Sequence, residues 1–153
     1  MRRYSPVAGF GAEGAFYSAT GSANISHVDV RDIAAVAIGA MRGGGHEGKA
    51  YTLTGPEAIT HDEIAAEFSG VLGRSITYVS LPSSDLKAGM LAGGMPEELA
   101  DRMVDLERYF REDSASGISE DVKLVTGESP RSFKDFLRET AATGVLDEGA
   151  STP

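Results

Sequence analysis

Residues 25–41 combine two patterns of apolar and polar side chains. Ile25 to Val28 alternate apolar and polar positions, which predicts a half-buried β-strand. From Ile33 to Met41 the apolar positions recur at helical spacing, which predicts an amphipathic helix. Asp29 stands between the two patterns and is typical of a helix N-cap, and Asp32 adds a second carboxylate as in a capping box. The stretch therefore predicts a strand that leads directly into a helix.

The two acids at this junction allow two interpretations. In the first, Asp29 and Asp32 cap the helix and interact with its dipole. In the second, the strand end lies at a ligand crevice, because α/β sheets bind ligands at the carboxyl ends of their strands. The strong preference of Asp for the N-cap position favours the first interpretation.

The rest of the chain alternates between short strand patterns and helical patterns. Strands are expected near residues 16–17 and at residues 49–54 and 75–81, and helices at residues 60–72, 83–91, 96–110, 120–126 and from residue 132 onward. Together these elements predict an α/β, or α+β-like, fragment with a small mixed sheet of about three strands and five to six helices. Residues 1–14 are expected to form an irregular lead-in, residues 15–142 one lobe, and residues 143–153 a disordered tail.

Composition and charge narrow the classes of function. The 153 residues carry a net charge of −9 and include no cysteine. Such an acidic chain is not expected to bind nucleic acid or an anionic membrane surface. The missing cysteines exclude disulfides and thiolate sites, and are compatible with the reducing cytoplasm, where we expect the protein to be. No apolar run approaches the length of a membrane span.

Several segments together resemble the carboxyl-terminal half of the NmrA-like, NAD(P)-binding proteins, which are atypical short-chain dehydrogenases. The segments that carry the resemblance are AEGAFY (12–17), ISHVDVRDIAAVA (25–37), HEGKAYTLTGPEAITHDEIA (46–65), VLGRSITYVSLP (71–82), GMPEELAD (94–101) and TGESPRSFKDFLRE (126–139). The resemblance implies the substrate lobe of an extended Rossmann-type protein. It further implies an NAD(P)H-dependent oxidoreductase that acts on a small carbonyl or quinone.

The glycine-rich turn that holds the dinucleotide pyrophosphate in this family has no convincing counterpart. Gly9, Gly11 and Gly14 match the letters G-x-G-x-x-G, but neither a strand before them nor a helix after them is predicted. The glycines at 43–45 follow a helix instead of a strand. NAD(P) is therefore the cofactor implied for the family, and we expect no tight binding of it by this chain alone.

The candidate substrate-pocket residues are Phe16, Tyr17 and His27. Position 27 is usually aromatic and near the substrate cleft in the resembling family, so His27 could line a pocket or donate a proton, although a hydrogen-bonded strand residue is the simpler interpretation. His46 is expected in a solvated loop and His61 in a capped first helical turn, so no metal site is predicted. The G-x-S-x-G elbow and the Tyr-x-x-x-Lys pair are absent, and the catalytic residues remain unknown.

Two alternatives to an oxidoreductase lobe stay open at this point. The chain could be a non-enzymatic regulatory or binding module, with the apolar face of the Ile33–Met41 helix mediating self-association or binding to a partner protein. It could also be a truncated gene product.

Overall fold

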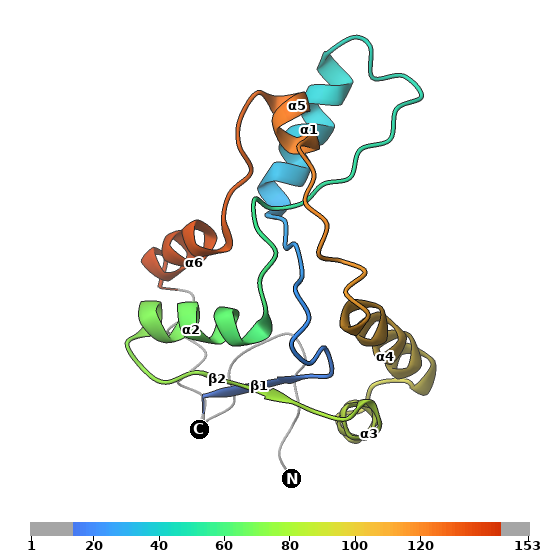
Figure 1. Ribbon diagram of the computed structural model, residues 1–153, viewed down its shortest axis with the longest axis vertical. Helices are drawn as coiled ribbons and strands as arrows, with labels where there is room; N and C mark the ends of the chain where they lie inside the picture. Colours follow the sequence, from blue (N-terminus) through green and yellow to red (C-terminus); the bar gives the residue numbers. More distant parts are fainter. Residues whose placement is uncertain (1–13, 145–153) are drawn as a thin grey trace.

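The computed structural model describes residues 14–144 and confirms the α/β class. Its elements in chain order are β1 (Ala15–Ser18), α1 (Val30–Arg42), α2 (His61–Leu72), β2 (Thr77–Ser80), α3 (Ser83–Ala92), α4 (Glu97–Arg111), α5 (Asp121–Thr126) and α6 (Phe133–Ala142) (Figure 1). The predicted irregular lead-in and disordered tail fall almost entirely on residues 1–13 and 145–153, which lie outside the described residues. Within the described part, no helix is both long and apolar enough to cross a membrane.

The sheet consists of β1 and β2, which pair in parallel. Phe16 lies opposite Tyr78, and Ser18 lies opposite Ser80. A parallel pair needs a crossover connection, and the segment between the strands provides it with α1 and α2. The sheet among residues 14–144 is thus smaller than the three-stranded mixed sheet predicted from the sequence.

The predicted strand at Ile25–Val28 is wrong. Ile25 forms a single antiparallel bridge with Ile59, and Ser26 N–H donates to the carbonyl of Ala115 at 2.9 Å. Backbone groups that alternate between different partners cannot form a continuous ladder. The alternation of apolar and polar residues reflects an extended segment buried on one side, without a strand neighbour.

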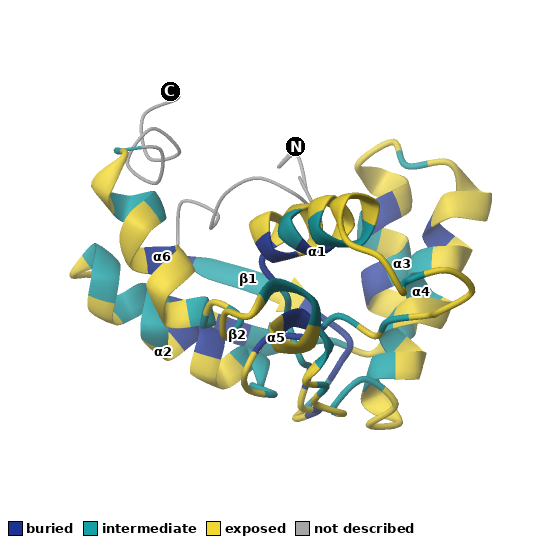
Figure 2. Ribbon diagram, turned by 90° about the horizontal axis from the view of Figure 1, so that it is seen from above, coloured by how far each residue is buried: buried dark blue, intermediate teal, exposed yellow. Residues whose placement is uncertain are grey.

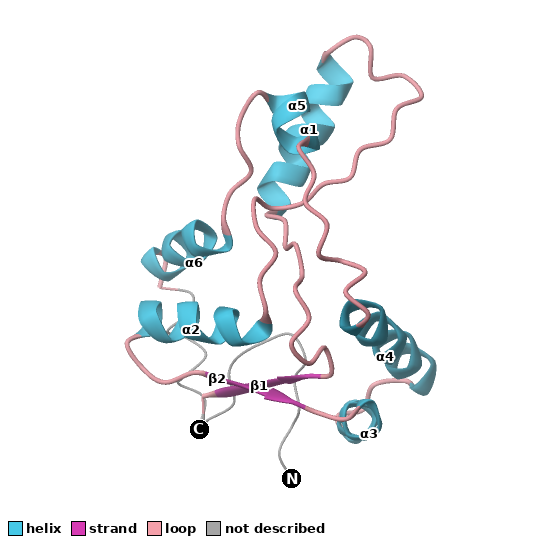
Figure 3. Cartoon of the chain, viewed as in Figure 1, coloured by secondary structure: helices cyan, strands magenta, loops and turns pink. Residues whose placement is uncertain are grey.

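The predicted strand at residues 49–54 is also wrong, and the segment is a loop (Figure 3). Its polar groups bind to the region that enters α5. Thr52 N–H donates to Oδ2 of Asp121 at 2.7 Å, and the Thr54 hydroxyl accepts from Ser119 N–H at 3.0 Å. Hydrogen bonds that involve side chains thus take the place of the strand-to-strand hydrogen bonds expected from the sequence.

The helices pack in three pairs around and above the sheet (Figure 1). Helix α2 contacts both β2 and α6, α3 contacts α4, and α1 contacts α5 at a distance from the strands. Two apolar clusters result. Beside α2 the cluster comprises Ala65, Ile76 and Tyr78 with Phe16, Phe68 and Leu72, and between α3 and α4 it comprises Ala19, Leu86, Met90 and Ala100 with Leu81, Met95 and Met103.

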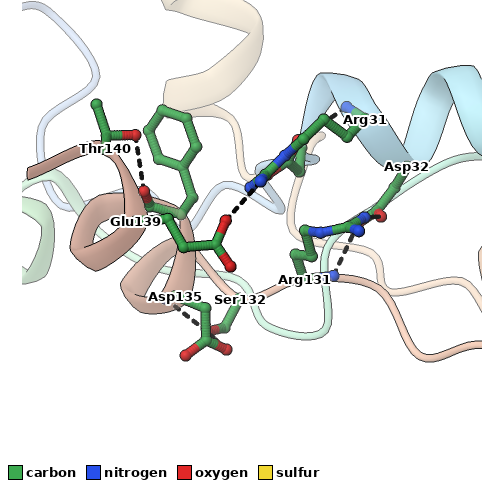
Figure 4. A network of polar contacts seen from close by, with 9 residues as sticks. Arg31, Asp32, Arg131, Ser132, Asp135, Glu139 and Thr140 are labelled. Carbon is green, nitrogen blue, oxygen red and sulfur yellow. Dashed lines mark hydrogen bonds and ion pairs between the residues drawn. The ribbon is translucent and has the colours of Figure 1, made fainter. Parts of the chain in front are cut away.

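The two acids at the start of α1 have different contacts, and Figure 4 shows the one between Asp32 and Arg131. Asp29 is the N-cap, as predicted, and accepts from Arg31 N–H at 2.8 Å. Asp32 does not complete a capping box. Its buried carboxylate instead accepts from the backbone N–H and the guanidinium of Arg131, just before α6. Both acids thus support the structure, and Asp32 connects α1 to the entry of α6.

The predicted apolar stripe of α1 is only partly buried (Figure 2). Val36 is 4% exposed, whereas Ile33 is 42% and Met41 77% exposed. A similar difference affects α4, where the apolar residues Leu99 and Tyr109 are about half exposed, whereas Ala100 and Met103 contribute to the core. Helical spacing predicted the positions of both helices correctly, but it did not predict how wide their buried faces are.

Capping signals located helix ends well. Thr60 and Glu63 form a capping box at the start of α2, and Gly73 ends that helix in the left-handed conformation at φ 64°. Ser132 caps α6 by accepting from Asp135 N–H. Pro82 precedes α3. The first turn of α2 faces the sheet, so that His61 lies against Tyr78 of β2.

Candidate functional site

The carboxyl end of β1 separates the predicted pocket residues onto two faces. Side chains alternate along a strand, so Phe16 and Tyr17 point to opposite sides. Phe16 packs against Tyr78 of β2, with ring centroids 5.4 Å apart. Tyr17 instead lines an apolar hollow of about 170 Å³ with Leu81 and Leu86 at the α3 side. Phe16 and Tyr17 therefore cannot line the same pocket wall.

Five aromatic rings from separate segments gather on the Phe16 face. His61, the first residue of α2, stacks on Tyr78 at 5.0 Å and 28° and lies 5.7 Å from Phe16. His27 presents an edge to His61 at 6.4 Å. Phe133 of α6 lies 6.2 Å beyond His27. The structure thus brings Phe16 and His27 together around His61. We call Phe16, His27, His61, Tyr78 and Phe133 the aromatic cluster.

A group of hydroxyls lies next to the aromatic cluster and is almost completely buried. Thr20 is 1% and Ser18 6% exposed. The Thr20 hydroxyl lies 2.7 Å from Nδ1 of His61, 2.9 Å from the Ser18 hydroxyl and 3.2 Å from the Tyr78 hydroxyl. Ser18 and Tyr78 are 3.3 Å apart. The hydroxyls satisfy one another in the low-dielectric interior and fix the orientation of the His61 ring.

Both histidines of the aromatic cluster are neutral at pH 7. Burial lowers the pKa of His27, and it lowers the pKa of His61 to about 4 with a smaller contribution from the nearby His27. Nε2 of His27 is sealed from solvent and has no hydrogen-bond partner among the described residues. The roles of His27 as a pocket residue and as a proton donor therefore both stay predictions.

Helix α4 closes the end of β1 on the other side. Glu107 accepts from the N–H of Ala19 at 2.9 Å, and Arg111 Nε donates to the carbonyl of Ala19 at 2.7 Å. Glu107 and Arg111 lie one helical turn apart on α4 and bind the N–H and the carbonyl group of Ala19, respectively. Beyond this contact, a polar hollow of about 430 Å³ is lined by residues 20–24, Arg111 and Asp113.

Sequence reasoning missed three residues of this region, namely Thr20, His61 and Tyr78. The sequence places His61 correctly in a capped first turn, but no spacing signal indicates that its ring turns inward. Tyr78 lies in the strand predicted at residues 75–81, with no signal of a role for its hydroxyl. Thr20 looks like an ordinary turn residue before Gly21. The pairing of β1 with β2 and the packing of α2 on β2 bring these side chains together.

The described residues offer neither a metal site nor a dinucleotide-phosphate site. No three His, Asp or Glu side chains lie together as a possible ligand set within residues 14–144. Pyrophosphate binding needs a strand, a glycine-rich turn and a helix N-terminus in direct succession. In the described part β1 runs into a turn at Gly21 and Ser22 and then into an extended segment, with no helix before Val30, and β2 runs through Pro82 into α3 without a glycine.

The last glycine of the letters G-x-G-x-x-G, Gly14, has a different role. Gly14, the one member within the described residues, leads into strand β1 and not into a helix. Its φ is 69°, and an added Cβ would lie 2.6 Å from the carbonyl oxygen of Ser75. This glycine is thus required by backbone packing at the start of the sheet. The described residues therefore supply no glycine-rich turn that fits the NAD(P) pyrophosphate.

Comparison with solved structures defines the class of protein. The fold matches Rossmann-like NAD(P)-binding proteins over about half of their length. A quinone oxidoreductase from *Escherichia coli*, solved with NADPH, matches with a TM-score of 0.77 and 28% identity over 84% of this chain and 46% of its own. The triphenylmethane reductase of *Citrobacter* sp., solved with NADP(H), matches with a TM-score of 0.75 and 26% identity over 84% of this chain and 45% of its own.

Sequence comparison then identifies the family. The profile of the NmrA-like family matches residues 15–137, and the chain belongs to this family. An NAD(P)H azoreductase of *Xenophilus azovorans* is 41% identical over 85% of this chain and 46% of its own length. An agroclavine dehydrogenase of *Claviceps fusiformis* is 35% identical over 83% and 44%, respectively. The chain therefore spans slightly less than half the length of these relatives, which are oxidoreductases by name.

Proposed function

We propose that this chain forms the substrate-side lobe of an NAD(P)H-dependent oxidoreductase that reduces a small carbonyl or quinone. The observation that carries the proposal is the aromatic cluster at the carboxyl end of β1, where Phe16, His27 and His61 converge on one face. Ligands of open α/β sheets bind beyond this end of the strands. Relatives named as azoreductase and quinone oxidoreductase support the same class of reaction.

The rings and hydroxyls suit a flat conjugated acceptor. Aromatic side chains bind planar rings by stacking, and a few fixed polar groups orient the ligand. The buried hydroxyls of Ser18 and Thr20 hold the imidazole of His61 in place. We also propose that the protein is located in the cytoplasm, as expected from the sequence.

NAD(P) is the cofactor of the proposed complete enzyme, yet the residues described here do not supply its phosphate site. Calorimetric titration of the chain with NADPH is expected to show no binding in the micromolar range. A parallel titration with menadione, followed by NMR, is expected to shift resonances of Phe16, His61 and Tyr78. Micromolar NADPH binding would contradict the assignment of this chain to the substrate side alone, and unchanged cluster resonances would contradict the acceptor site.

A second candidate function is a binding module that acts through α1. Its outer surface exposes Ile38 (45%) and Met41 (77%), and Leu124 of the adjacent α5 is 73% exposed. Contiguous exposed apolar surface marks sites of association. Self-association should appear in light scattering as a mass that rises with concentration and falls in the Met41→Lys variant. A monomer at all concentrations would exclude a dimer formed through this face.

A further inference from the structure

Arg111 of α4 lies where both strands of the sheet end. Its Nε donates to the carbonyl of Ala19, which follows β1, at 2.7 Å, and its Nη2 donates to the carbonyl of Leu81, which follows β2, at 3.4 Å. Figure 1 shows α3 and α4 at this end of the sheet. The two backbone contacts fix the guanidinium at the carboxyl end of the parallel pair, where α/β folds bind ligands.

The charge of Arg111 has no counter-ion among residues 14–144. Its neighbour on the same helix, Arg108, pairs with Asp105 at 2.9 Å. Glu107, one helical turn before Arg111, accepts from the N–H of Ala19 instead of pairing with the guanidinium. Within the described part, Nη1 of Arg111 has no hydrogen-bond acceptor, because the two backbone contacts use Nε and Nη2. An anchored guanidinium with free N–H groups is suited to bind a carboxylate.

Asp113 brings the opposite charge to the same place. It lines the polar hollow of about 430 Å³ together with Arg111, and its carboxylate forms no ion pair or hydrogen bond with another described residue. Its backbone is left-handed at φ 58°, and its N–H donates to the carbonyl of Phe110 at 2.9 Å. This turn at the end of α4 fixes the position of the carboxylate. The hollow therefore offers a cation and an anion that are not paired with each other.

The apolar hollow of about 170 Å³ adjoins these charges through Leu81. Leu81 lines it together with Tyr17 and Leu86, and the carbonyl of Leu81 is the one that Arg111 binds. The surface of the hollow is almost entirely apolar, although Asp85 contributes to its wall. An apolar cavity of about 150 Å³ is large enough to bind benzene, so this hollow has room for a phenyl ring. It lies on the Tyr17 face of β1, away from the aromatic cluster.

We propose that the two hollows together bind a small zwitterion with an aromatic ring, of the type of an aromatic α-amino acid. The carboxylate of the ligand accepts from Arg111, its ammonium group donates to Asp113, and its ring occupies the apolar hollow beside Tyr17. Charge complementarity favours the zwitterion, because a simple anion meets Asp113 and a simple cation meets Arg111. This binding involves no electron transfer and does not depend on the proposed reductase function.

The test uses the full chain with L-phenylalanine as the probe, followed by NMR and calorimetry. The probe is expected to shift the amide resonances of Tyr17, Ser22 and Arg111 and to leave those of Phe133 in place. Three analogues each remove one group of the probe: 3-phenylpropionate lacks the ammonium, 2-phenylethylamine lacks the carboxylate, and L-alanine lacks the ring. Each is expected to bind about tenfold more weakly, which corresponds to one lost charge-assisted hydrogen bond or to the lost burial of the ring.

Two variants connect the groups of the probe to single residues. Asp113→Asn is expected to weaken L-phenylalanine about tenfold but not 3-phenylpropionate, which has no ammonium group. Asparagine tolerates the left-handed conformation as aspartate does, so the turn is kept. Arg111→Gln is expected to weaken both ligands. The matched control is Arg108→Gln, which is expected to change neither affinity, because Arg108 lines neither hollow.

The titrations of the wild-type chain decide the inference even if Arg111→Gln does not fold. If L-phenylalanine shifts no resonance of residues 17–24 or of Arg111, the site is refuted. If L-phenylalanine and 3-phenylpropionate bind equally well, the role of Asp113 and the zwitterion are refuted. Neither result affects the acceptor site, because menadione tests that site separately at the aromatic cluster.

Discussion

Asp32 of α1 accepts two hydrogen bonds from Arg131, one from its backbone N–H at 2.7 Å and one from its guanidinium (Figure 4). The two residues are 99 positions apart, and the carboxylate is 4% exposed. This contact holds the segment before α6 against the start of α1. It gives the α1–α5 pair a fixed connection to the part of the molecule that contains Phe133.

Asp32→Asn is expected to lower the free energy of unfolding by about 2 kcal/mol, since a hydrogen bond between charged groups is replaced by a poorly matched amide. Urea denaturation followed by circular dichroism measures the change. The control is Asp105→Asn, which removes an ion pair with Arg108 whose partners are both about two-thirds exposed. That change should stay within about 0.5 kcal/mol. Equal effects of the two variants would show that the buried contact stabilises the protein no more than the exposed ion pair.

Stability is expected to fall as the pH drops from about 6.5 towards 4. An unfolded histidine takes up its proton near pH 6.5, whereas the pKa of folded His61 is about 4 and that of His27 is also lowered. Between these values the unfolded state binds more protons, so protonation favours unfolding. The two neutral histidines make their full contribution to the free energy of unfolding above pH 6.5, and about 2 kcal/mol of this free energy should be lost by pH 4.5.

Urea midpoints at pH 7.5, 6.0 and 4.5 measure this loss. His61→Asn should flatten the pH dependence, and His46→Asn should leave it unchanged. The carboxylate of Asp29, whose pKa is lowered mainly by Arg31, contributes its own loss only at still lower pH. A steep fall that persists in His61→Asn would assign the effect to other groups.

Gly55→Ala is expected to destabilise the protein by about 2–3 kcal/mol, because overpacking forces a backbone shift. A Cβ at Gly55 would lie 2.1 Å from the carbonyl oxygen of His27. The same shift should displace His27 and change the aromatic resonances of the cluster. Gly70→Ala in α2 is the matched control, since nothing lies within 4 Å of its added Cβ.

The control substitution should stabilise the protein by about 0.5–1 kcal/mol, because alanine is the better helix former. Thermal unfolding and NMR spectra of both variants decide the comparison. If Gly55→Ala is as stable as wild type, the close approach of residues 27 and 55 is not a constraint on the site.

Sequence patterns predicted the helices better than the strands, for a physical reason. Helix ends depend on local capping, and Thr60 and Ser132 reveal their positions within three residues of sequence. A strand exists only if a distant segment pairs with it. Ile25–Val28 has the pattern of a strand but lacks the partner, because Ile59 and Ala115 divide its hydrogen bonds.

The candidate site was predictable to a similar extent. The resemblance to the family indicated Phe16 and His27, and the structure places both in one cluster. The strand expected at residues 16–17 already implies that Phe16 and Tyr17 point to opposite faces, but the sequence could not indicate which of the two faces α2 covers. Thr20 and His61 escaped notice because their contact joins residues 41 positions apart through a side-chain hydrogen bond.

The parallel pairing of β1 with β2 also sets the order in which this molecule can assemble. Ser18 and Thr77 are separated by the whole segment that holds α1 and α2, so β1 leaves the ribosome well before its partner. At about 5–20 residues per second, the delay amounts to several seconds. During that time the edge of β1 is open, and Phe16 has no Tyr78 to contact. The helices can form early, but the surface proposed to meet the acceptor is completed only when the second strand arrives.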